Sequence, residues 1–484
     1  MKTAERHLPA IALGFLVVAT IVGFFYYPTY PNYDSYYSLI WGHEVLHGHL
    51  PTFDAYRAPT QHPLAVGFGA FLSLFGQIGD RIMLFCTLAS FVVLCMGLYR
   101  LGKALFTPLV GLAAAAIFCT RFDFPFLAAR AYIDIPFLAF IIWAAALEVE
   151  KPRRGGIVWV LLISAGLLRP EAWLLIGLYF LWESTGEGVT WNDRFKFVAI
   201  AAIAPVVWVA TDFIATGAPL FSLQHTSGLA EELGRAKGLS AVPSSLKEFF
   251  LSLAKLPVVL AGIAGAVILS FLSPKRLVMP LVLWLVGVGT FVLVGIAGLS
   301  VIDRYLLVPA MMTMLMAAVT LAGWTMLEER STPRRVWAGA ALLVVIFGIV
   351  FTATRVTVDN FKIELESRGE QHDELVAILD DPKVRAGLKC GPISVPNHKL
   401  VPEVRWLLGG AGVDDVIARS DDARQDAKQY GVALYVASRQ ALLRQAIVNN
   451  DDDPLDSVPM DGVVRVANSK DYGAFVRCKK TTRK

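Results

Sequence analysis

Residues 27–37 read Tyr27-Pro-Thr-Tyr-Pro-Asn-Tyr-Asp34-Ser-Tyr-Tyr37, and they come directly after the apolar run Leu8 to Tyr27. A run of about 20 apolar residues is long enough to cross the hydrocarbon core of a membrane as a helix. The polar, aromatic stretch behind it continues to Leu64. Loops held by a rigid scaffold carry a large share of binding and catalytic residues. We therefore expect functional residues in this stretch.

The composition is that of a membrane protein. Of the 484 residues, 55% are hydrophobic and 17% are charged, whereas soluble domains carry about 25% charged residues. Apolar runs recur from Leu8 to Ala353. The net charge of +4 is too small to indicate a nucleic-acid partner. We expect an α-helical polytopic protein of the cytoplasmic (inner) membrane.

The basic residues predict the topology, because Lys and Arg in short loops mark the cytoplasmic side. Lys2 and Arg6 precede the first run, which places the N-terminus in the cytoplasm and the Asp34 loop outside. No small-residue cleavage site follows this run, so we expect a retained helix rather than a signal peptide. Alternation of basic loops predicts about eleven spans. Leu64 to Gly76 then stays outside as a juxtamembrane helix.

The spans in the middle of the chain follow from the same alternation. Leu109 to Thr120 and Ile133 to Val149 are predicted as single spans, and Ile157 to Trp182 as an out-and-back pair broken at Arg169-Pro170. A polar outer segment is expected at roughly Gly217 to Lys255.

The C-terminal part is polar, with alternating helix-like and strand-like pieces. We therefore divide the chain into a transmembrane domain (1–354) and a small extracytoplasmic α/β domain (355–484). Strands are expected at Cys390–Val395, Val432–Val436, Val463–Val466 and Ala474–Cys478. Helices are expected at Asp373–Leu379 and Arg439–Val448, and a turn or mobile loop at Asn449–Pro454. An oxidising compartment would allow Cys390 and Cys478 to pair, whereas Cys86, Cys95 and Cys119 are expected to be inert packing residues in spans.

Asp34 is the first candidate for chemistry. A carboxylate at the membrane face is costly unless it is paired or used. Asp34 follows the first span closely and is surrounded by tyrosines, so it would suit a general base or a metal ligand in a partly dry cleft. The alternative is an interfacial aromatic belt with an acid in a helix-cap position.

His43-Glu44-Val45-Leu46-His47 matches the H-E-x-x-H pattern of zinc proteases. On a helix this spacing puts both imidazoles on one face beside the Glu. Such short patterns also occur by chance, and a third ligand is required that no spacing in the sequence nominates.

Several charged groups would suit an anionic head group, because guanidinium binds phosphate bidentately. Arg57 and His62 lie in the first loop, and Arg304-Tyr305 follows Asp303 at the outer mouth of a late span. The alternatives are a basic rim facing lipid phosphates and snorkelling of Arg304 to head groups.

Two further charged positions interrupt apolar sequence. Asp134 opens a span before Pro136, either as a functional acid or as an N-cap. Arg169-Pro170-Glu171 breaks another run, and two charges at membrane depth require a cavity or each other. Both a cavity-lining role and a self-satisfied ion pair stay open.

These motifs, in this order, resemble the GT-C superfamily of membrane glycosyltransferases, close to the protein O-mannosyltransferase and lipid A aminoarabinose transferase group. The resemblance covers roughly Leu8 to Ala353. It rests on Asp34, Gly48-His49-Leu50-Pro51, Arg57-Ala-Pro59-Thr-Gln-His62-Pro63-Leu64, Tyr132-Ile-Asp134-Ile-Pro136, Gly166-Leu-Leu-Arg169-Pro170-Glu171 and Asp303-Arg304-Tyr305-Leu-Leu-Val-Pro309. One departure is that Ser35 follows Asp34, where protein O-mannosyltransferases carry an Asp-Glu pair, which argues against a protein acceptor.

The resemblance implies a glycosyltransferase that uses a polyprenyl-phosphate sugar and acts on an acceptor hydroxyl of a cell-envelope glycan, lipid or protein. Asp34 would be the general base. Asp134 would orient a substrate or share a divalent cation with Asp34, and the sequence leaves that cofactor open. The donor phosphate and its surroundings would be held by Arg57, His62, Arg169, Glu171, Arg304 and Tyr305.

A transporter or flippase for a lipid-linked anion is the alternative of another class. Many spans and broken helices favour it. Against it, the ionisable groups cluster at the outer mouths rather than at the midplane, and no inverted repeat is evident.

Overall fold

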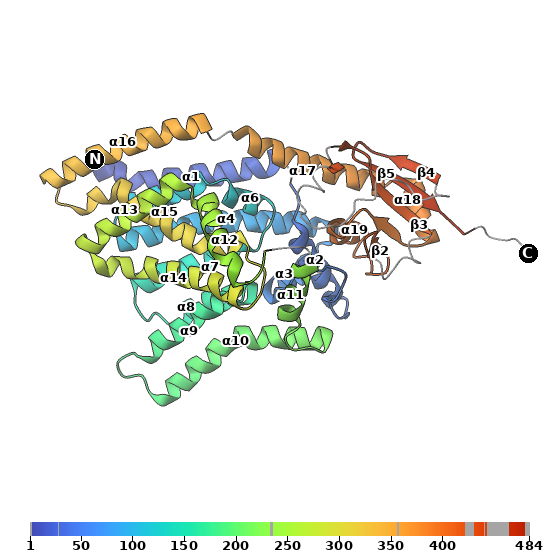
Figure 1. Cartoon of the computed structure of the whole chain (residues 1–484), viewed down its shortest axis with the longest axis horizontal. Helices are drawn as coiled ribbons and strands as arrows, with labels where there is room; N and C mark the ends of the chain where they lie inside the picture. The colour runs from blue at the N-terminus through green and yellow to red at the C-terminus, as the bar shows by residue number, and fades with distance from the viewer. Residues whose placement is uncertain are drawn as a thin grey trace, which may run out of the picture. The chain divides into compact units, whose positions relative to one another are not determined.

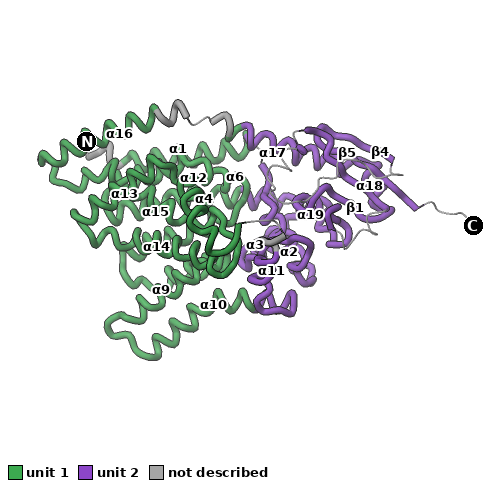
Figure 2. The backbone as a smooth tube through the Cα atoms, in the orientation of Figure 1, with its two compact units in different colours: residues 1–26, 85–209, 236–362 green, residues 27–84, 210–235, 363–484 purple. Residues whose placement is uncertain are grey.

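The computed structural model describes residues 2–27, 29–232, 236–355, 358–421, 430–439, 441–442 and 464–479. The chain is mostly helical and divides into two compact units, which are described separately (Figures 1 and 2). Unit 1 contains residues 1–26, 85–209 and 236–362, and unit 2 contains residues 27–84, 210–235 and 363–484. The C-terminal residues thus share a compact unit with the first loop. The division into domains at residue 354 stays a prediction.

Unit 1 is a helical bundle built around one buried helix. That helix, α15 (Leu307–Ala322), is buried along almost its whole length and packs against α5, α13 and α14. Its sequence is apolar on every side, which is the pattern of a helix with no solvent-facing stripe. The helices of unit 1 are α1 (Lys2–Tyr26), most of α4 (Gly79–Leu105), α5 (Pro108–Cys119), α6 (Asp123–Ala129), α7 (Asp134–Glu150), α8 (Gly156–Leu168), α9 (Ala172–Ser184), most of α10 (Trp191–Thr216), α12 (Val242–Ala254), α13 (Leu256–Leu272), α14 (Pro274–Ile296), α15 and α16 (Thr332–Arg355).

Candidate spans number six to eight among the described residues, fewer than the eleven expected. Six helices are long and apolar enough, and two bent pairs would raise the count to eight. The expected number of spans was too high because short apolar elements were counted as spans. Helices α8 and α9 have 13 residues each, about 20 Å at about 1.5 Å per residue, against a hydrocarbon core of about 30 Å. The six are His7–Tyr26, Gly76–Leu105, Trp191–Thr216, Pro274–Ile296, Asp303–Met326 and Thr332–Val350.

The two bent pairs explain other differences. Helices α5 and α6 meet at 68°, so the expected Leu109–Thr120 span is one arm of a bent element. The expected polar outer segment contains α11 (Phe221–Glu232) and α12, and α12 meets the apolar helix α13 at 93°. Helix α3 (Pro63–Ser73) has 11 residues, too few to span a membrane. Its position outside and the cytoplasmic N-terminus stay predictions.

Unit 2 contains a mixed five-stranded sheet in the order β2-β1-β3-β5-β4. The strands are β1 (Ile393–Val395), β2 (Val416–Ala418), β3 (Gly431–Val436), β4 (Val464–Asn468) and β5 (Tyr472–Arg477). β1 is parallel to β2 and β3, and β5 is antiparallel to β3 and β4. The four predicted strands are confirmed, with edges shifted by a few residues. β2 was missed because its three residues give too short a pattern to recognise, whereas β1, also of three residues, was recognised within the longer run Cys390–Val395.

Helices cover this sheet and extend to the first loop. α17 (Val358–Leu379), α18 (Pro382–Gly387) and α19 (Val401–Leu407) contribute to the core with the strands. The unit also holds α2 (Tyr33–Leu46), α3, α11 and the short helices η1 (Gly76–Ile78), η5 (Leu388–Cys390) and η6 (His398–Leu400). Most of the predicted helix Arg439–Val448 and the whole predicted turn Asn449–Pro454 lie outside the described residues.

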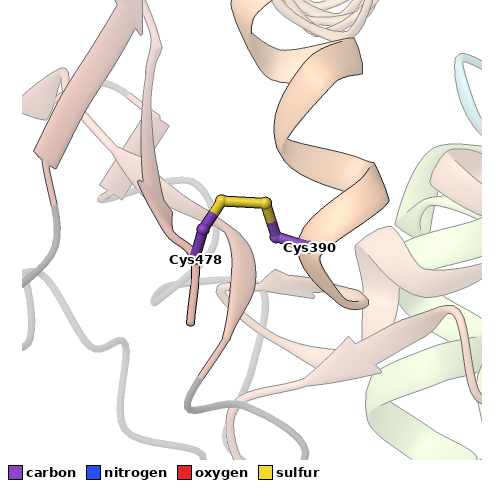
Figure 3. Close-up of a disulfide and its surroundings, with 2 residues drawn as sticks. All are labelled: Cys390 and Cys478. Atoms are coloured by element: carbon purple, nitrogen blue, oxygen red, sulfur yellow. A yellow bond between two sulfur atoms is a disulfide. The ribbon is translucent and has the colours of Figure 1, made fainter. Parts of the chain in front are cut away.

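A disulfide joins Cys390, at the end of η5, to Cys478, just after β5 (Figure 3). The two Cα atoms are 5.1 Å apart and the residues are 88 apart in sequence. The bond therefore closes a long loop that includes the whole sheet. Cys86, Cys95 and Cys119 are free.

Candidate active site

Unit 1 holds a buried cluster of charges where α8 and α9 are separated. Arg169-Pro170-Glu171 forms this break, and Asp134, which is fully buried, begins α7. Arg169 donates one hydrogen bond from Nη1 to Asp134, and two to Glu171 Oε1, from Nε at 2.9 Å and from Nη2 at 2.6 Å. The expected ion pair is thus present, but Arg169 is shared between two carboxylates.

The second arginine comes from η3 (Asp303–Leu306). Arg304 Nη1 donates to Asp134 Oδ2 at 3.3 Å, so each oxygen of Asp134 accepts from a different arginine. Tyr305 lies beside this pair, with its ring centre 5.3 Å from Arg169 Cζ. Burial of charge is tolerated when the charges are paired and hydrogen-bonded, and here two cations face two carboxylates. Arg169 is almost fully buried, while the Arg304 side chain keeps 27% of its surface exposed.

A small cavity borders this cluster. Its volume is about 20 Å³, close to the space of one water molecule. Glu171, Arg304 and Tyr305 form its polar side, and Phe137, Ile141, Leu175, Leu283, Val286, Gly287, Thr290 and Val308 line the remainder. Glu171 Oε2 is buried and accepts no hydrogen bond from the described part of the chain. The cavity thus offers one carboxylate acceptor and one guanidinium donor on an apolar wall, which would suit a single hydroxyl group.

Asp34 lies in unit 2, in the first turn of α2. The N-cap of this helix is Asn32, whose Oδ1 accepts from the backbone N–H groups of Asp34 at 2.8 Å and Ser35 at 3.2 Å. The alternative of Asp34 as the capping residue is therefore wrong. Asp34 is instead half-buried in the first turn of the helix, two residues after the cap.

Tyr33 and Tyr37, which lie on the same helix as Asp34, are protonated at neutral pH. Burial raises the pKa of Tyr37 to about 12, although Arg405 opposes the shift. Burial and the nearby Tyr37 and Asp34 hold the pKa of Tyr33 well above its usual range. Each phenol is therefore a hydrogen-bond donor. Tyr33 donates to the carbonyl oxygen of Arg57 at 2.6 Å, which ties the start of α2 to the Arg57 segment.

Arg57 has a backbone φ of +53°. This left-handed conformation costs a non-glycine residue about 1–2 kcal/mol, and such strain concentrates at functional sites. The guanidinium Cζ lies 5.3 Å from the ring centre of Tyr56. His62, five residues on, occupies the N-cap position of α3, where a helix start favours anions.

The H-E-x-x-H motif has a structural use. Glu44 accepts from Arg405 Nη2 at 2.6 Å and from the backbone N–H of Thr52 at 2.9 Å, and Arg405 is 1% exposed. The rings of His43 and His47 lie 4.1 Å apart, and burial together with His47 lowers the pKa of His43. No group of three or more potential metal ligands occurs among the described residues. Arg405, 361 positions away, carries no signal in sequence that would have linked it to Glu44.

A second polar network in unit 2 was not anticipated. His372 Nδ1 lies 2.6 Å from Glu403 Oε1, and its ring stacks on Tyr30 with centres 4.8 Å apart. Burial alone would lower the pKa of His372, but the hydrogen bond and charge of Glu403, with the charges of Asp80 and Asp373, raise it on balance.

Comparison with solved structures identifies the fold. The chain matches the crystal structure of ArnT from Cupriavidus metallidurans bound to undecaprenyl phosphate, with a TM-score of 0.57 and 13% sequence identity, over 96% of this chain and 97% of that one. The fold is GT-C-like. The match to the archaeal oligosaccharyltransferase AglB from Archaeoglobus fulgidus, in complex with an inhibitory peptide and a dolichol-phosphate, has a TM-score of 0.54 and 9% identity. It covers 93% of this chain and 72% of AglB.

The GT-C resemblance drawn from the motifs is thereby confirmed at the level of fold. ArnT and AglB are GT-C membrane glycosyltransferases that use polyprenyl-phosphate substrates. No sequence-family profile matches the chain. No curated protein matches it in sequence either.

Proposed function

We propose that the protein is a glycosyltransferase that moves a sugar from a polyprenyl-phosphate donor to an acceptor hydroxyl at the outer face of the cytoplasmic membrane. The observation that carries the proposal is the fold match over 96% of the chain to a structure bound to undecaprenyl phosphate. The roles of individual residues are part of the proposal.

In the proposed reaction the ionised carboxylate of Asp34 takes the proton of the acceptor hydroxyl as general base. The acceptor oxygen forms a bond to C1 of the sugar from the face opposite the phosphate, so the anomeric configuration inverts. The bond between C1 and the phosphate oxygen breaks, and its electron pair stays on that oxygen. The leaving group is then a lipid monophosphate with one more negative charge than the phosphodiester.

Cationic groups stabilise the charge that develops on the leaving phosphate. Arg57 and His62 are proposed for this role because guanidinium and imidazolium donate hydrogen bonds to phosphate oxygens. Arg304, the more exposed arginine of the unit 1 cluster, is an alternative candidate for this role. Arg169 is proposed to hold Asp134 and Glu171 in place, with Glu171 and Tyr305 as the groups that meet hydroxyls at the small cavity.

The outer-face location is supported by two independent features. Basic residues mark one side of the membrane in the predicted topology, and the Cys390–Cys478 disulfide requires an oxidising compartment. Both features support a location of the unit 2 sheet outside the cytoplasm.

The test is transfer of labelled sugar by the purified full-length protein in lipid nanodiscs, with undecaprenyl-phosphate sugars as donors and envelope glycolipid extract as acceptor. Asp34→Asn should abolish transfer, while its affinity for undecaprenyl phosphate stays within about twofold of the native value, because the carboxylate acts on the acceptor. Asp54→Asn is the matched control, since Asp54 is an exposed acid of the same loop. Near-normal turnover by Asp34→Asn would contradict the general-base assignment.

A flippase for a lipid-linked anion would give a different result in the same nanodiscs and in proteoliposomes. It would move the intact lipid between leaflets without forming a new glycosidic bond. Labelled product in the acceptor fraction therefore separates transferase from transporter.

A further inference from the structure

The segment from Arg57 to His62 is held by a second part of the chain that lies about 150 residues later. Residues 210–235, from the end of α10 through α11, belong to unit 2 together with this segment. Three successive points of the loop are hydrogen-bonded to it. His225 Nε2 lies 2.8 Å from the carbonyl oxygen of Ala58, and the hydroxyls of Thr60 and Thr226 lie 2.5 Å apart.

The third point of attachment is a buried carboxylate. Asp212 is 1% exposed and Gln61 is 2% exposed. Gln61 Nε2 donates to Asp212 Oδ1 at 3.1 Å and to Thr211 Oγ1 at 3.0 Å. Asp212 is fixed in turn by Ser222, which donates from its hydroxyl at 2.7 Å and from its backbone N–H at 2.8 Å. Oδ1 of Asp212 therefore joins Gln61 of the loop to Ser222 at the start of α11, and Oδ2 holds the backbone of Ser222.

These contacts explain how Arg57 keeps its left-handed backbone. A residue that is not glycine returns from this conformation to an ordinary one unless its surroundings fix it. Tyr33 holds the carbonyl of Arg57, His225 holds the next carbonyl, and Asp212 holds Gln61 beside His62. The loop is fixed on both sides of the two residues proposed to bind phosphate.

We propose that Asp212 is a positioning residue for the donor phosphate, acting through Gln61 and with His225 and Thr226 to keep Arg57 and His62 in their binding conformation. The inference rests on the proposed function, in which Arg57 and His62 meet the phosphate. A ligand that binds only one conformation loses apparent affinity in proportion to the fall in that conformation's population. If the loop is correctly placed one-tenth of the time without Asp212, the Kd rises about tenfold.

The experiment compares Asp212→Asn with Glu148→Gln in the full-length protein. Glu148 is a matched control because it is also buried and also accepts several hydrogen bonds, from Trp182, Tyr179 and the Arg153 backbone, but it belongs to unit 1. Two quantities are measured: the Kd for undecaprenyl phosphate, and hydrogen–deuterium exchange of the peptide that contains residues 57–62. If the native protein transfers sugar, the KM for the donor and kcat are measured as well.

Asp212→Asn should raise the Kd and the donor KM about tenfold, leave kcat within about twofold, and speed exchange in residues 58–62. Glu148→Gln should change none of these. Unchanged exchange or unchanged Kd in Asp212→Asn would overturn the proposal, and so would equal losses in both variants. If Asp212→Asn does not fold, Thr226→Val removes the Thr60 contact with little change of volume and should show the same effect to a smaller degree; no effect there overturns the proposal.

The outcomes separate this inference from the proposed function. A native protein that neither binds undecaprenyl phosphate nor transfers sugar contradicts the proposed function, and with it the phosphate role of Asp212. A native protein that binds and transfers, with an Asp212→Asn variant that does both equally well, contradicts only the positioning role.

Discussion

Asp134 is the residue on which the unit 1 cluster depends, because each of its oxygens accepts from a different arginine. The two arginines are not equivalent. Arg169 is almost fully buried and also pairs with Glu171, so its loss would leave Glu171 without a cation and the buried Asp134 with Arg304 alone. Breaking a buried ion pair in this way costs about 3–5 kcal/mol. Arg304 has a more exposed side chain and borders the cavity. Its loss should act on the reaction more than on folding.

Arg304→Ala is expected to lower kcat about 100-fold, as loss of one donor to a developing oxyanion does. The thermal midpoint should change little, because Asp134 keeps Arg169. Turnover and thermal unfolding are measured on the same nanodisc samples. Arg100→Ala is the control, since Arg100 forms an exposed ion pair with Glu150 in the same unit. Losses of turnover that merely follow losses of stability would mean that Arg304 is structural.

His372 makes the stability of unit 2 depend on pH. Its folded-state pKa is raised above the ordinary value of 6.5 by Glu403, Asp80 and Asp373, which together outweigh burial. A group with a raised pKa contributes stability that is complete below its unfolded pKa and is lost as pH rises through its folded pKa. The thermal midpoint of the native protein should therefore fall as pH rises above 6.5.

His372→Asn should flatten this part of the curve, measured by intrinsic fluorescence at several pH values. His49→Asn, at an exposed position of the first loop, should leave it unchanged. A variant that keeps the native slope would show that another group causes the dependence.

At the scale of elements, α2 carries Asp34 and its position depends on close packing with α3. A Cβ on Gly42 would lie against the backbone of Gly69 and Ala70, and a Cβ on Gly69 would lie against the carbonyl oxygen of Ser38. Both glycines are required because the two backbones approach more closely than any side chain allows. The position of Asp34 therefore depends on these two glycines.

Gly42→Ala should destabilise the protein by about 1–3 kcal/mol, the usual cost of overpacking, and lower activity by shifting α2. Gly67→Ala is the matched change in α3, where a Cβ meets nothing within 4 Å. It should be neutral or stabilise by up to about 1 kcal/mol, because alanine is the better helix former. Thermal unfolding in detergent measures both, and equal effects would contradict the packing argument.

Much of the secondary structure was predictable from the sequence. Four strands were recognised because runs such as Val432–Val436 combine β-branched and aromatic residues between breakers. The spans were overcounted because both halves of the pair broken at Arg169-Pro170 were taken as spans. α8 and α9 have only 13 residues each, so neither half is long enough to cross the hydrocarbon core.

The candidate site was predictable only in part. Single residues such as Asp134 and Arg304 were chosen because a charge in apolar sequence is costly. The hydrogen bond between them was not predicted, because 170 positions separate the two residues. The same holds for Glu44 with Arg405 and for Gln61 with Asp212. These contacts result from tertiary packing, and a single sequence contains no local pattern for them.

At the scale of the whole molecule, the disulfide stabilises the C-terminal part of unit 2, which contains the five-stranded sheet. It closes a loop of 88 residues, and closure of such a loop is worth about 2–4 kcal/mol. The Cys390→Ser, Cys478→Ser double variant should lose about this much in the free energy of unfolding. Dithiothreitol should lower the thermal midpoint of the native protein and leave the double variant unaffected. A midpoint that does not respond in the native protein would show that the bond is not formed or adds nothing.

The composition of unit 2 has a consequence for biogenesis. The first loop emerges from the ribosome early, but Glu44 meets Arg405 and Tyr56 meets the carbonyl of Ser420 only after nearly the entire chain has been synthesised. The residues that contact the Asp34 loop are therefore synthesised only after the later helices of the chain. We expect nascent and truncated chains to be inert, so that catalytic competence appears late, as one of the last events of assembly.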